Sequence, residues 1–264
     1  MYPRFEPDSQ YFASGAYGST VAKAALKSPQ LARDTIDGIG RSDSTALAFG
    51  SLWDQWLTGD RSAIIQRPLT YEDAKTGEVK PWHHASGVCK AWDAAHASHT
   101  VVKPQDSERL SLMHERMPTL LHEIISSGMH QAVFRVDQGD FMAQCKVDVL
   151  CQDEMVDVKT TGTPLEDFYK KALDYGYDVQ AGWYRWIVRE ITGELLPFSF
   201  IVTESMSPYR TVHFRPDAEW LAAADEAADR AVRIIARSAA TDDWGDMKPI
   251  IQTLSLPPWR QKGN

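Results

Sequence analysis

The chain has 264 residues, of which 43% are hydrophobic and 24% are charged, and its formal net charge at pH 7 is −8. This composition suits one large globular domain, or one domain with a helical appendage, and no apolar run approaches the roughly 18 residues that cross a bilayer. The acidic balance argues against a simple nucleic-acid binder, because phosphate neutralisation supplies most of that affinity, but it does not exclude an enzyme with a local basic channel.

The N-terminus and the cysteines indicate a reduced, intracellular setting. The opening MYPRFEPDSQYF lacks the basic-then-apolar layout of a signal peptide, so we expect a cytosolic protein. Cys89, Cys145 and Cys151 form an odd set without a CxxC pair. This pattern disfavours a disulfide framework and a zinc or iron–sulfur knot, so we expect reduced, packed thiols.

Two helical segments are predicted in the first 60 residues. The first, residues 19–36, is broken near Pro29, and the second runs from a cap at Asp43 or Ser44 to Gly59.

Turn-forming residues then gather along the chain, among them Pro68, Gly77 and Pro81. They predict an irregular insertion over about residues 60–100. Beyond it, apolar residues at three- and four-residue spacing predict one amphipathic helix over residues 106–128.

After residue 128 the hydrophobic period changes from helix-like to strand-like. Two strands around a turn form a predicted hairpin, and a third strand follows. A helical region, two more strands and a long helix complete the order. The predicted strands are 130–137, 140–151, 155–161, 197–205 and 210–216, and the predicted helical segments are 164–193 and 217–239.

This order predicts an α/β (α+β) fold, with a mixed central β-sheet flanked by helices and a helical N-terminal region. We expect a single domain over residues 1–264. Residues 1–127 would form its mainly helical part, including the insertion, and residues 128–264 its sheet-and-helix core.

Charged residues occupy positions in the second and third strands where packing residues are expected. Side chains alternate faces along a strand, so Lys146 shares a face with Asp148 in CKVDVLC, and Asp157 shares a face with Lys159 in MVDVKTT. A short hairpin through residues 152–153 would make the two strands antiparallel neighbours. Asp148 and Asp157 would then lie close together.

Two close carboxylates repel, and one takes up a proton unless they share a cation. Mg²⁺ is such a cation, since it is typically held by one or two carboxylates, waters and substrate phosphate oxygens. A lysine beside it can orient or deprotonate an attacking water and offset charge on phosphorus. Asp148, Asp157 and Lys159 therefore suit phosphodiester hydrolysis, although the same triplet also fits the solvated charges of an ordinary hairpin.

A later helix favours the hydrolytic interpretation. Gln180 and Tyr184 are four residues apart and share one helix face, where an amide and a phenol suit contacts to a phosphate or a base. The alternative for Tyr184 is a place in the aromatic core with Trp183 and Trp186.

The ordered set Asp148, Asp157-Val158-Lys159 and Gln180-x-x-x-Tyr184 resembles the PD-(D/E)xK nuclease superfamily, in its RecB-like branch. Further segments resemble, in order, the catalytic domain of RecE-type exonuclease VIII and its phage relatives. They are YFASGAYGSTVAKAALKSPQ, ALAFGSLWDQWL, CKVDVL, VDVKTT, YGYDVQAGWY, PFSFIVTESMSPY and IQTLSLPPW. The resemblance spans almost the whole chain outside residues 60–100 and implies a restriction-endonuclease-like core.

The resemblance also implies an activity and partners. Members of this family are metal-dependent exonucleases, using Mg²⁺ or in its place Mn²⁺, that degrade one strand of linear double-stranded DNA from 5′ to 3′. The 3′ single-stranded overhang serves a RecT-like single-strand annealing protein in recombination. A homo-oligomeric ring with a basic lumen would let an acidic protein enclose DNA. We therefore expect a cytoplasmic, phage- or prophage-encoded protein without membrane association.

Site residues carry over from the resemblance by position. The metal-binding and catalytic group is Asp148, Asp157, Val158 through its carbonyl, and Lys159. The predicted DNA-contacting group is Gln180, Tyr184, Thr160 and Lys146.

The sequence departs from the family in two places. FGSLWD places Asp54 where the family usually has a histidine metal ligand, and YDVQ places Asp178 where relatives often have histidine. Because a carboxylate suits Mg²⁺ or Mn²⁺ at least as well as imidazole does, Asp54 is a candidate ligand. Otherwise it is a solvated helix residue. Gln131 stands near a position that is acidic in relatives, in an alignment too loose to assign it a role.

Four histidines are interpreted as surface or packing residues: His83, His84, His96 and His99. The charged helix residues are interpreted as solvated faces, with contacts to backbone phosphates as the alternative. They are Lys170, Lys171, Arg185, Arg189, Arg230, Arg233 and Arg237. Two alternatives to an exonuclease stay open. One is a catalytically weakened nuclease-fold protein that binds DNA without cutting it, and the other is a RecB-like endonuclease.

Overall fold

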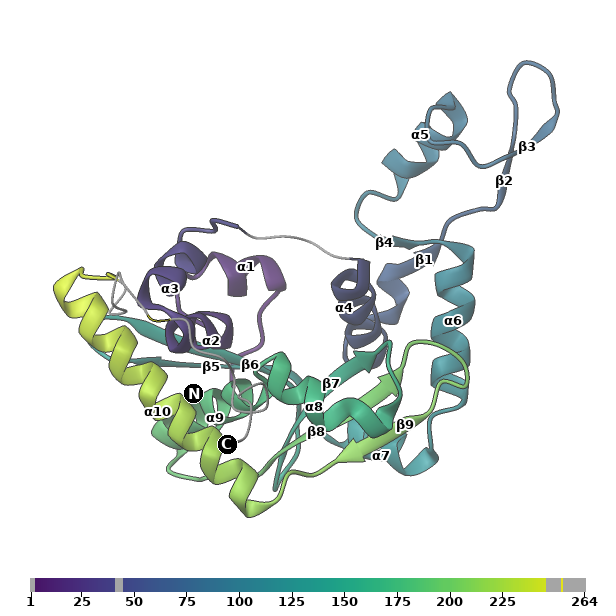
Figure 1. The fold of residues 1–264 in the computed structure, drawn as a ribbon. Coiled ribbons are helices and arrows are strands. Elements are labelled where there is room, and N and C mark those ends of the chain that lie inside the picture. Colours follow the sequence, from purple (N-terminus) through teal and green to yellow (C-terminus); the bar gives the residue numbers. More distant parts are fainter. Residues whose placement is uncertain (1–2, 41–44, 246–252, 254–264) are drawn as a thin grey trace.

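The computed structural model describes residues 3–40, 45–245 and residue 253. Within them the main sheet has five strands in the order β5-β6-β7-β8-β9 (Figure 1). Neighbouring strands are antiparallel except β7 and β8, which are parallel. The predicted mixed central sheet is therefore confirmed. Its strands are β5 Met129–Asp137, β6 Met142–Leu150, β7 Met155–Thr161, β8 Phe198–Glu204 and β9 Thr211–Phe214.

The N-terminal region is helical, as predicted. Its helices are α1 Asp8–Ala13, α2 Ser19–Lys27, α3 Pro29–Ile36 and α4 Thr45–Thr58. The predicted helical segment is interrupted at Ser28, between α2 and α3. The Ser28 hydroxyl caps α3, and Pro29 takes its first helical position. The predicted cap of α4 at residue 43 or 44 lies outside the described residues.

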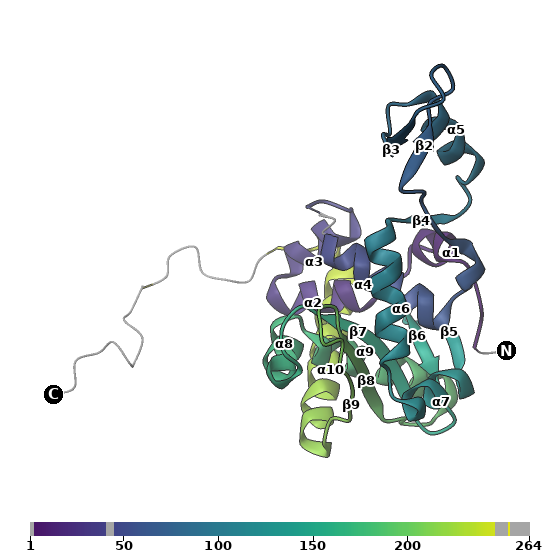
Figure 2. The same ribbon diagram turned by 90° about the vertical axis from the view of Figure 1, so that its right-hand side faces the viewer.

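A lobe formed by residues 60–103 projects away from the sheet (Figures 1 and 2). Strand β1 pairs in parallel with β4, and β2 pairs with β3 in antiparallel fashion. The predicted irregular insertion thus contains short regular elements. Sequence did not predict its strands, because three residues are too few to show an alternating hydrophobic pattern. The elements are η1 Arg61–Ala63, β1 Ile64–Gln66, β2 Thr70–Glu72, β3 Val79–Pro81, α5 Gly87–Ala95 and β4 Thr100–Val102.

The prediction of one helix over residues 106–128 is wrong. The segment forms two helices, α6 Pro104–Glu115 and α7 Thr119–Ser127. Pro118 lies between them; it has no N–H to donate and disfavours helical backbone in the residue before it. The apolar spacing continues through the break because both helices bury their apolar faces in the same core.

The predicted helical region 164–193 also divides. It comprises η2 Leu165–Asp167, α8 Phe168–Asp174 and α9 Tyr177–Thr192. Gly176 separates α8 from α9 with a positive φ of 62°. The long helix α10, Ala218–Thr241, crosses α9 closely: a Cβ on Gly182 would lie 2.0 Å from the carbonyl oxygen of Ala224.

Helices cover both faces of the sheet and form two apolar cores. The first core joins α2, α9 and α10 to strand residues such as Val147, Met155 and Phe200. The second joins α4, α6 and α7 to strand residues such as Val156 and Val158. Strand β7 contributes to both cores, so it lies in the interior of the molecule. No described helix is long and apolar enough to span a membrane.

Candidate active site

The site begins where strands β6 and β7 separate. They pair antiparallel, as predicted, but only over Val149 with Val156 and Leu150 with Met155 in the described chain. The Asp148 carboxylate, one residue before Val149 on β6, accepts a hydrogen bond from the backbone N–H of Val158 at 2.9 Å. A side-chain oxygen thus takes the place of a main-chain acceptor. Asp148 is thereby held beside the Asp157–Lys159 segment.

Asp157 lies on β7 and is buried, with 2% of its surface exposed. Gln180 Nε2 of α9 donates a hydrogen bond to Asp157 Oδ1 at 2.6 Å, and Lys159 forms an ion pair with Oδ2. The predicted proximity of Gln180 to the acidic residues is therefore present in the structure, and its amide orients one of the two carboxylates.

Asp54 enters the site from α4. Thr58 Oγ1, one turn later, donates to Asp54 Oδ1 at 2.9 Å, and Gln131 Nε2 donates to the same oxygen at 3.1 Å. Gln131 lies within β5 with a positive φ of 55°, while the residues on either side of it keep their partners on β6 in one unbroken register. Sequence alone gives no signal for a positive φ at a glutamine.

The three carboxyl groups act on one another. Burial raises the pKa of Asp148 well above its ordinary value, and repulsion from Asp54 and Asp157 adds to the rise. Burial also raises the pKa of Asp54, and Asp157 adds to that effect. Gln131, which donates to Asp54, stands opposite Asp148 in the β5–β6 register, and Asp148 in turn binds the N–H of Val158 beside Asp157, so α4, β6 and β7 bring these three acids together. The structure therefore places Asp54 with the predicted pair rather than on a solvated helix face.

Lys159 supplies positive charge to these acids. Burial alone would lower the pKa of its ammonium, but attraction to Asp157 and Asp148 outweighs burial and holds the pKa above its ordinary value. Lys159 is therefore a permanent cation in this arrangement. A proton would leave it only with difficulty at neutral pH.

A second lysine, Lys23 of α2, was not identified from the sequence. Its Nζ atom lies 3.5 Å from Gln180 Oε1 and 5.3 Å from the centroid of the Tyr177 ring, while Lys159 Nζ lies 5.1 Å from the same centroid. Burial, with repulsion from Lys159, lowers the pKa of Lys23 to about 8. In the sequence, a lysine among alanines on an amphipathic helix looks no different from a solvated one.

The other predicted DNA contacts lie in different surroundings. Tyr184 is buried in the first core, with its ring edge-on to Phe198. Lys146 forms an ion pair with Asp8 of α1. Thr160 faces α4. The contribution of these three residues to DNA binding stays a prediction.

The interpretation of Arg185 as a solvated residue is wrong. Its guanidinium is buried and forms two hydrogen bonds with the Asp225 carboxylate, at 2.8 and 3.0 Å. This bidentate pair joins α9 to α10.

Comparison with known proteins places this geometry in a family. Residues 18–246 match the model of the "PDDEXK-like domain of unknown function (DUF3799)". The chain belongs to this family. The predicted PD-(D/E)xK superfamily is thereby confirmed, and the matched residues of this PDDEXK-like domain include Lys23 and every predicted site residue. A search of curated proteins found no match.

Among solved structures, the PDDEXK-like domain is similar to the crystal structure of a candidate exonuclease from Eubacterium rectale. The TM-score is 0.60 and the sequences are 18% identical, over 96% of each chain. At this identity the likeness concerns the fold, and it confirms the predicted fold class.

PDDEXK-like domains imply a divalent metal, and the residue types at this site fit one. No three His, Cys, Asp or Glu side chains among the described residues stand in a metal-holding arrangement as they are. The available donors are nevertheless carboxylate oxygens, the type that Mg²⁺ takes. Asp157 Oδ2 is buried, and apart from its ion contact with Lys159 it accepts no hydrogen bond from the described residues.

The raised pKa of Asp148 leads to a stability prediction for the metal-free protein. The folded state keeps a proton that the unfolded chain releases above the ordinary pKa of 3.8, so this contribution to stability is full below that pH and is lost as pH rises toward the folded pKa. Asp148→Asn stays neutral and keeps an acceptor for Val158 N–H. In EDTA at pH 7 we expect it to be more stable than wild type, by on the order of 1 kcal/mol.

Urea unfolding midpoints at pH 4 and pH 7 measure this effect, and the gain should shrink at pH 4. Asp153→Asn, in the exposed turn between β6 and β7, is the matched control and should change neither midpoint. A lower midpoint for Asp148→Asn at both pH values would contradict the account.

Proposed function

We propose that the protein is a divalent-metal-dependent deoxyribonuclease that degrades linear double-stranded DNA from 5′ to 3′ and leaves 3′ overhangs. The observation that carries the proposal is the grouping of Asp148, Asp157 and Asp54 with Lys159 at the point where two strands separate. Membership of the PDDEXK-like family and the fold shared with a candidate exonuclease support it.

Asp148 and Asp157 would hold the metal, with the Val158 carbonyl and Asp54 as further ligands. Mg²⁺ is the proposed ion, and Mn²⁺ could replace it, because both are hard ions that take oxygen ligands. When bound, the ion polarises the scissile phosphate and activates water for attack on phosphorus. Its charge would also relieve the repulsion that adds to the raised pKa values of Asp148 and Asp54.

Lys159 would stabilise the charge that builds up on the phosphate oxygens. Its raised pKa makes it a donor of positive charge rather than a base at neutral pH. With a metal held by Asp157, the Lys159 ammonium, which is paired with that carboxylate here, would be the positive group of this chain available to the phosphate.

Gln180 would keep Asp157 oriented, since its amide N–H holds Oδ1. Its carbonyl oxygen faces the Lys23 ammonium, so Gln180 links the acidic residues to a second cation. We propose that Lys23 and Lys159, whose ammonium groups lie 5.3 and 5.1 Å from the centroid of the same Tyr177 ring, bind the substrate backbone together.

The choice of an exonuclease with 5′-to-3′ polarity is supported by the sequence resemblance to the RecE-type family. The same resemblance supports a homo-oligomeric ring around DNA and a RecT-like annealing partner in recombination. An endonuclease would cut closed circular DNA, whereas an end-dependent exonuclease would leave it intact. A protein that only binds would shift linear DNA and release no nucleotides.

Lys159→Ala tests the catalytic assignment. We expect the variant to fold and bind DNA, but to lose hydrolysis of end-labelled linear duplex in Mg²⁺ by at least about a hundredfold, because a positive group aimed at the transition state is removed. Lys170→Ala, an exposed lysine on α8, is the control and should retain full activity. Near-normal nucleotide release by Lys159→Ala would refute the assignment.

Lys23→Ala tests the second cation. We expect kcat/KM on the same duplex to fall about tenfold at pH 7, mainly through KM, because a charge-assisted contact to DNA is lost. Lys23→Arg should restore most of the loss. Since a lysine with a pKa of about 8 is neutral at higher pH, the gap between wild type and Lys23→Ala should narrow as pH rises through 8.

Lys27→Ala, one turn later on α2 and exposed, controls for the loss of a positive charge. If both alanine variants lose activity equally, Lys23 has no specific role.

A further inference from the structure

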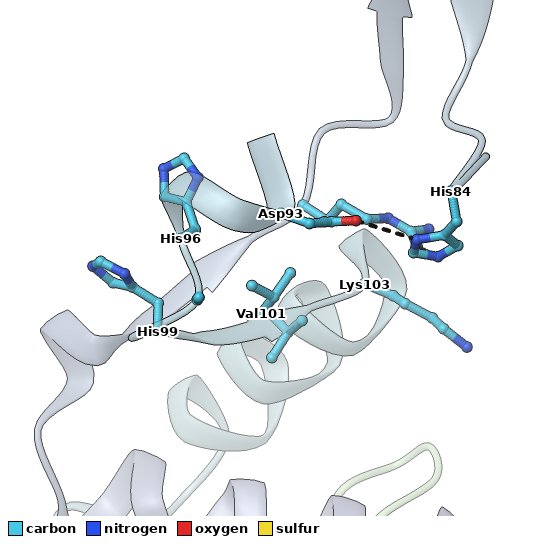
Figure 3. A pocket seen from close by; sticks show the side chains of 9 residues that line it. His84, Asp93, His96, His99, Val101 and Lys103 are labelled. Carbon is cyan, nitrogen blue, oxygen red and sulfur yellow. Dashed lines mark hydrogen bonds and ion pairs between the residues drawn. The ribbon is translucent and has the colours of Figure 1, made fainter. Parts of the chain in front are cut away.

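The projecting lobe contains a polar cavity that the acidic site does not use. Its volume is about 410 Å³. The residues around it come from β4, α5 and the segments between the short strands, and His84, His99 and Lys103 are exposed. Its polar lining, shown in Figure 3, is Arg67, His84, Asp93, His96, His99 and Lys103.

Contacts from Arg67 to His84 and from His84 to Asp93 run along this cavity and pair the Asp93 carboxylate with His84. Arg67 Nη1 lies 2.9 Å from His84 Nε2, and because arginine only donates, His84 Nε2 must accept. The proton of neutral His84 is then on Nδ1, which lies 3.5 Å from Asp93 Oδ2. Asp93 is the acidic residue of the lining, and it is turned toward His84 rather than toward Arg67 or Lys103.

Two cationic groups are therefore left with unused donors. Arg67 Nε is buried and has no hydrogen-bond partner among the described residues, although the guanidinium is held over the Trp82 ring at 5.7 Å from its centroid. The Lys103 side chain is exposed, and its ammonium forms no ion pair or hydrogen bond within the described chain. A buried donor without an acceptor costs about 1–3 kcal/mol. An oxyanion would satisfy both groups, because a guanidinium fork suits two oxygens of a phosphate.

The lobe is anchored beside the acidic site. Thr100 Oγ1 of β4 donates a hydrogen bond to Gln55 Oε1 at 3.0 Å, and Gln55 follows Asp54 on α4. One helix thus carries both a residue of the acidic site and the anchor of the lobe, which projects beyond α4 in both ribbon views (Figures 1 and 2).

We propose that this cavity binds a backbone phosphate of DNA, with Arg67 and Lys103 as the anion contacts. The inference rests on the proposed function for the identity of the ligand. The cavity would hold the nucleic acid at a second point outside the acidic site, and it would supply local positive charge on a chain whose net charge is −8.

The test measures binding of the full-length protein to a labelled linear duplex in EDTA, where no metal is present, by fluorescence anisotropy across a salt series. Lys103→Ala should weaken binding several-fold and lower the slope of log K against log salt by about 1, as expected for one lost phosphate contact. Lys90→Ala removes an exposed lysine of α5 that does not line the cavity, and it should change neither quantity.

A second variant keeps the charge but removes the fork. Arg67→Lys should weaken binding while leaving the salt slope close to that of wild type, and urea midpoints equal to wild type would show that each variant is folded. Equal affinity and slope for Lys103→Ala, Lys90→Ala and wild type would overturn the proposal.

Inorganic phosphate, compared with chloride at equal ionic strength, separates the two sources of this anion. If phosphate binding depends on Lys103 but duplex affinity does not, the cavity is a small-anion site and the DNA assignment fails. The test of this binding site can also fail or succeed independently of the proposed hydrolysis. A wild-type protein that shows the Lys103-dependent slope but releases no nucleotides in Mg²⁺ would refute hydrolysis and leave this binding site standing.

Discussion

Repulsion among three acidic side chains in a poorly solvated space is the constraint on which the site depends. Placing carboxylates away from water is expensive unless each is paired or hydrogen-bonded. Each acid has partners that offset part of this cost. Asp157 is paired with the Lys159 ammonium and accepts from the Gln180 amide. Asp54 accepts from the Thr58 hydroxyl and the Gln131 amide, and Asp148 accepts from a backbone N–H. The raised pKa values of Asp148 and Asp54 show that these partners do not fully offset burial and the added repulsion. A doubly charged ion would do so.

The packing of helices on both faces of the sheet brings the participating groups together. The core of α2, α9 and α10 holds Gln180 and Lys23 against one face of the sheet, and the core of α4, α6 and α7 holds Asp54 against the other. An unbroken sheet would separate these layers. Because β6 and β7 part after two residue pairs, groups from both layers meet at one opening. Gln131 of β5 contributes at the same place, where its amide donates to Asp54 of α4.

Sequence reasoning anticipated the parts of this arrangement that depend on local patterns. Strand alternation placed Asp157 and Lys159 on one face, and helical spacing identified Gln180, because both follow from backbone geometry alone. The sequence predicted α6 and α7 as one helix, because the apolar stripe continues through Pro118 when both helices face one core. Lys23 and the positive φ at Gln131 could not be identified, since tertiary packing decides whether a lysine is buried and where a strand residue adopts a left-handed backbone. Asp54 was only a candidate, because its closeness to Asp148 depends on how α4 packs on the sheet.

The most direct test of the central claim is anomalous scattering from crystals of the wild-type protein grown with Mn²⁺. The account predicts a peak bound by oxygens of both Asp148 and Asp157, at the roughly 2.0–2.2 Å typical of such small divalent ions, with the Lys159 ammonium displaced from Asp157. A peak that also touches Asp54 would establish the carboxylate in place of the family histidine. An ion found elsewhere, with Lys159 still paired to Asp157, would contradict the account.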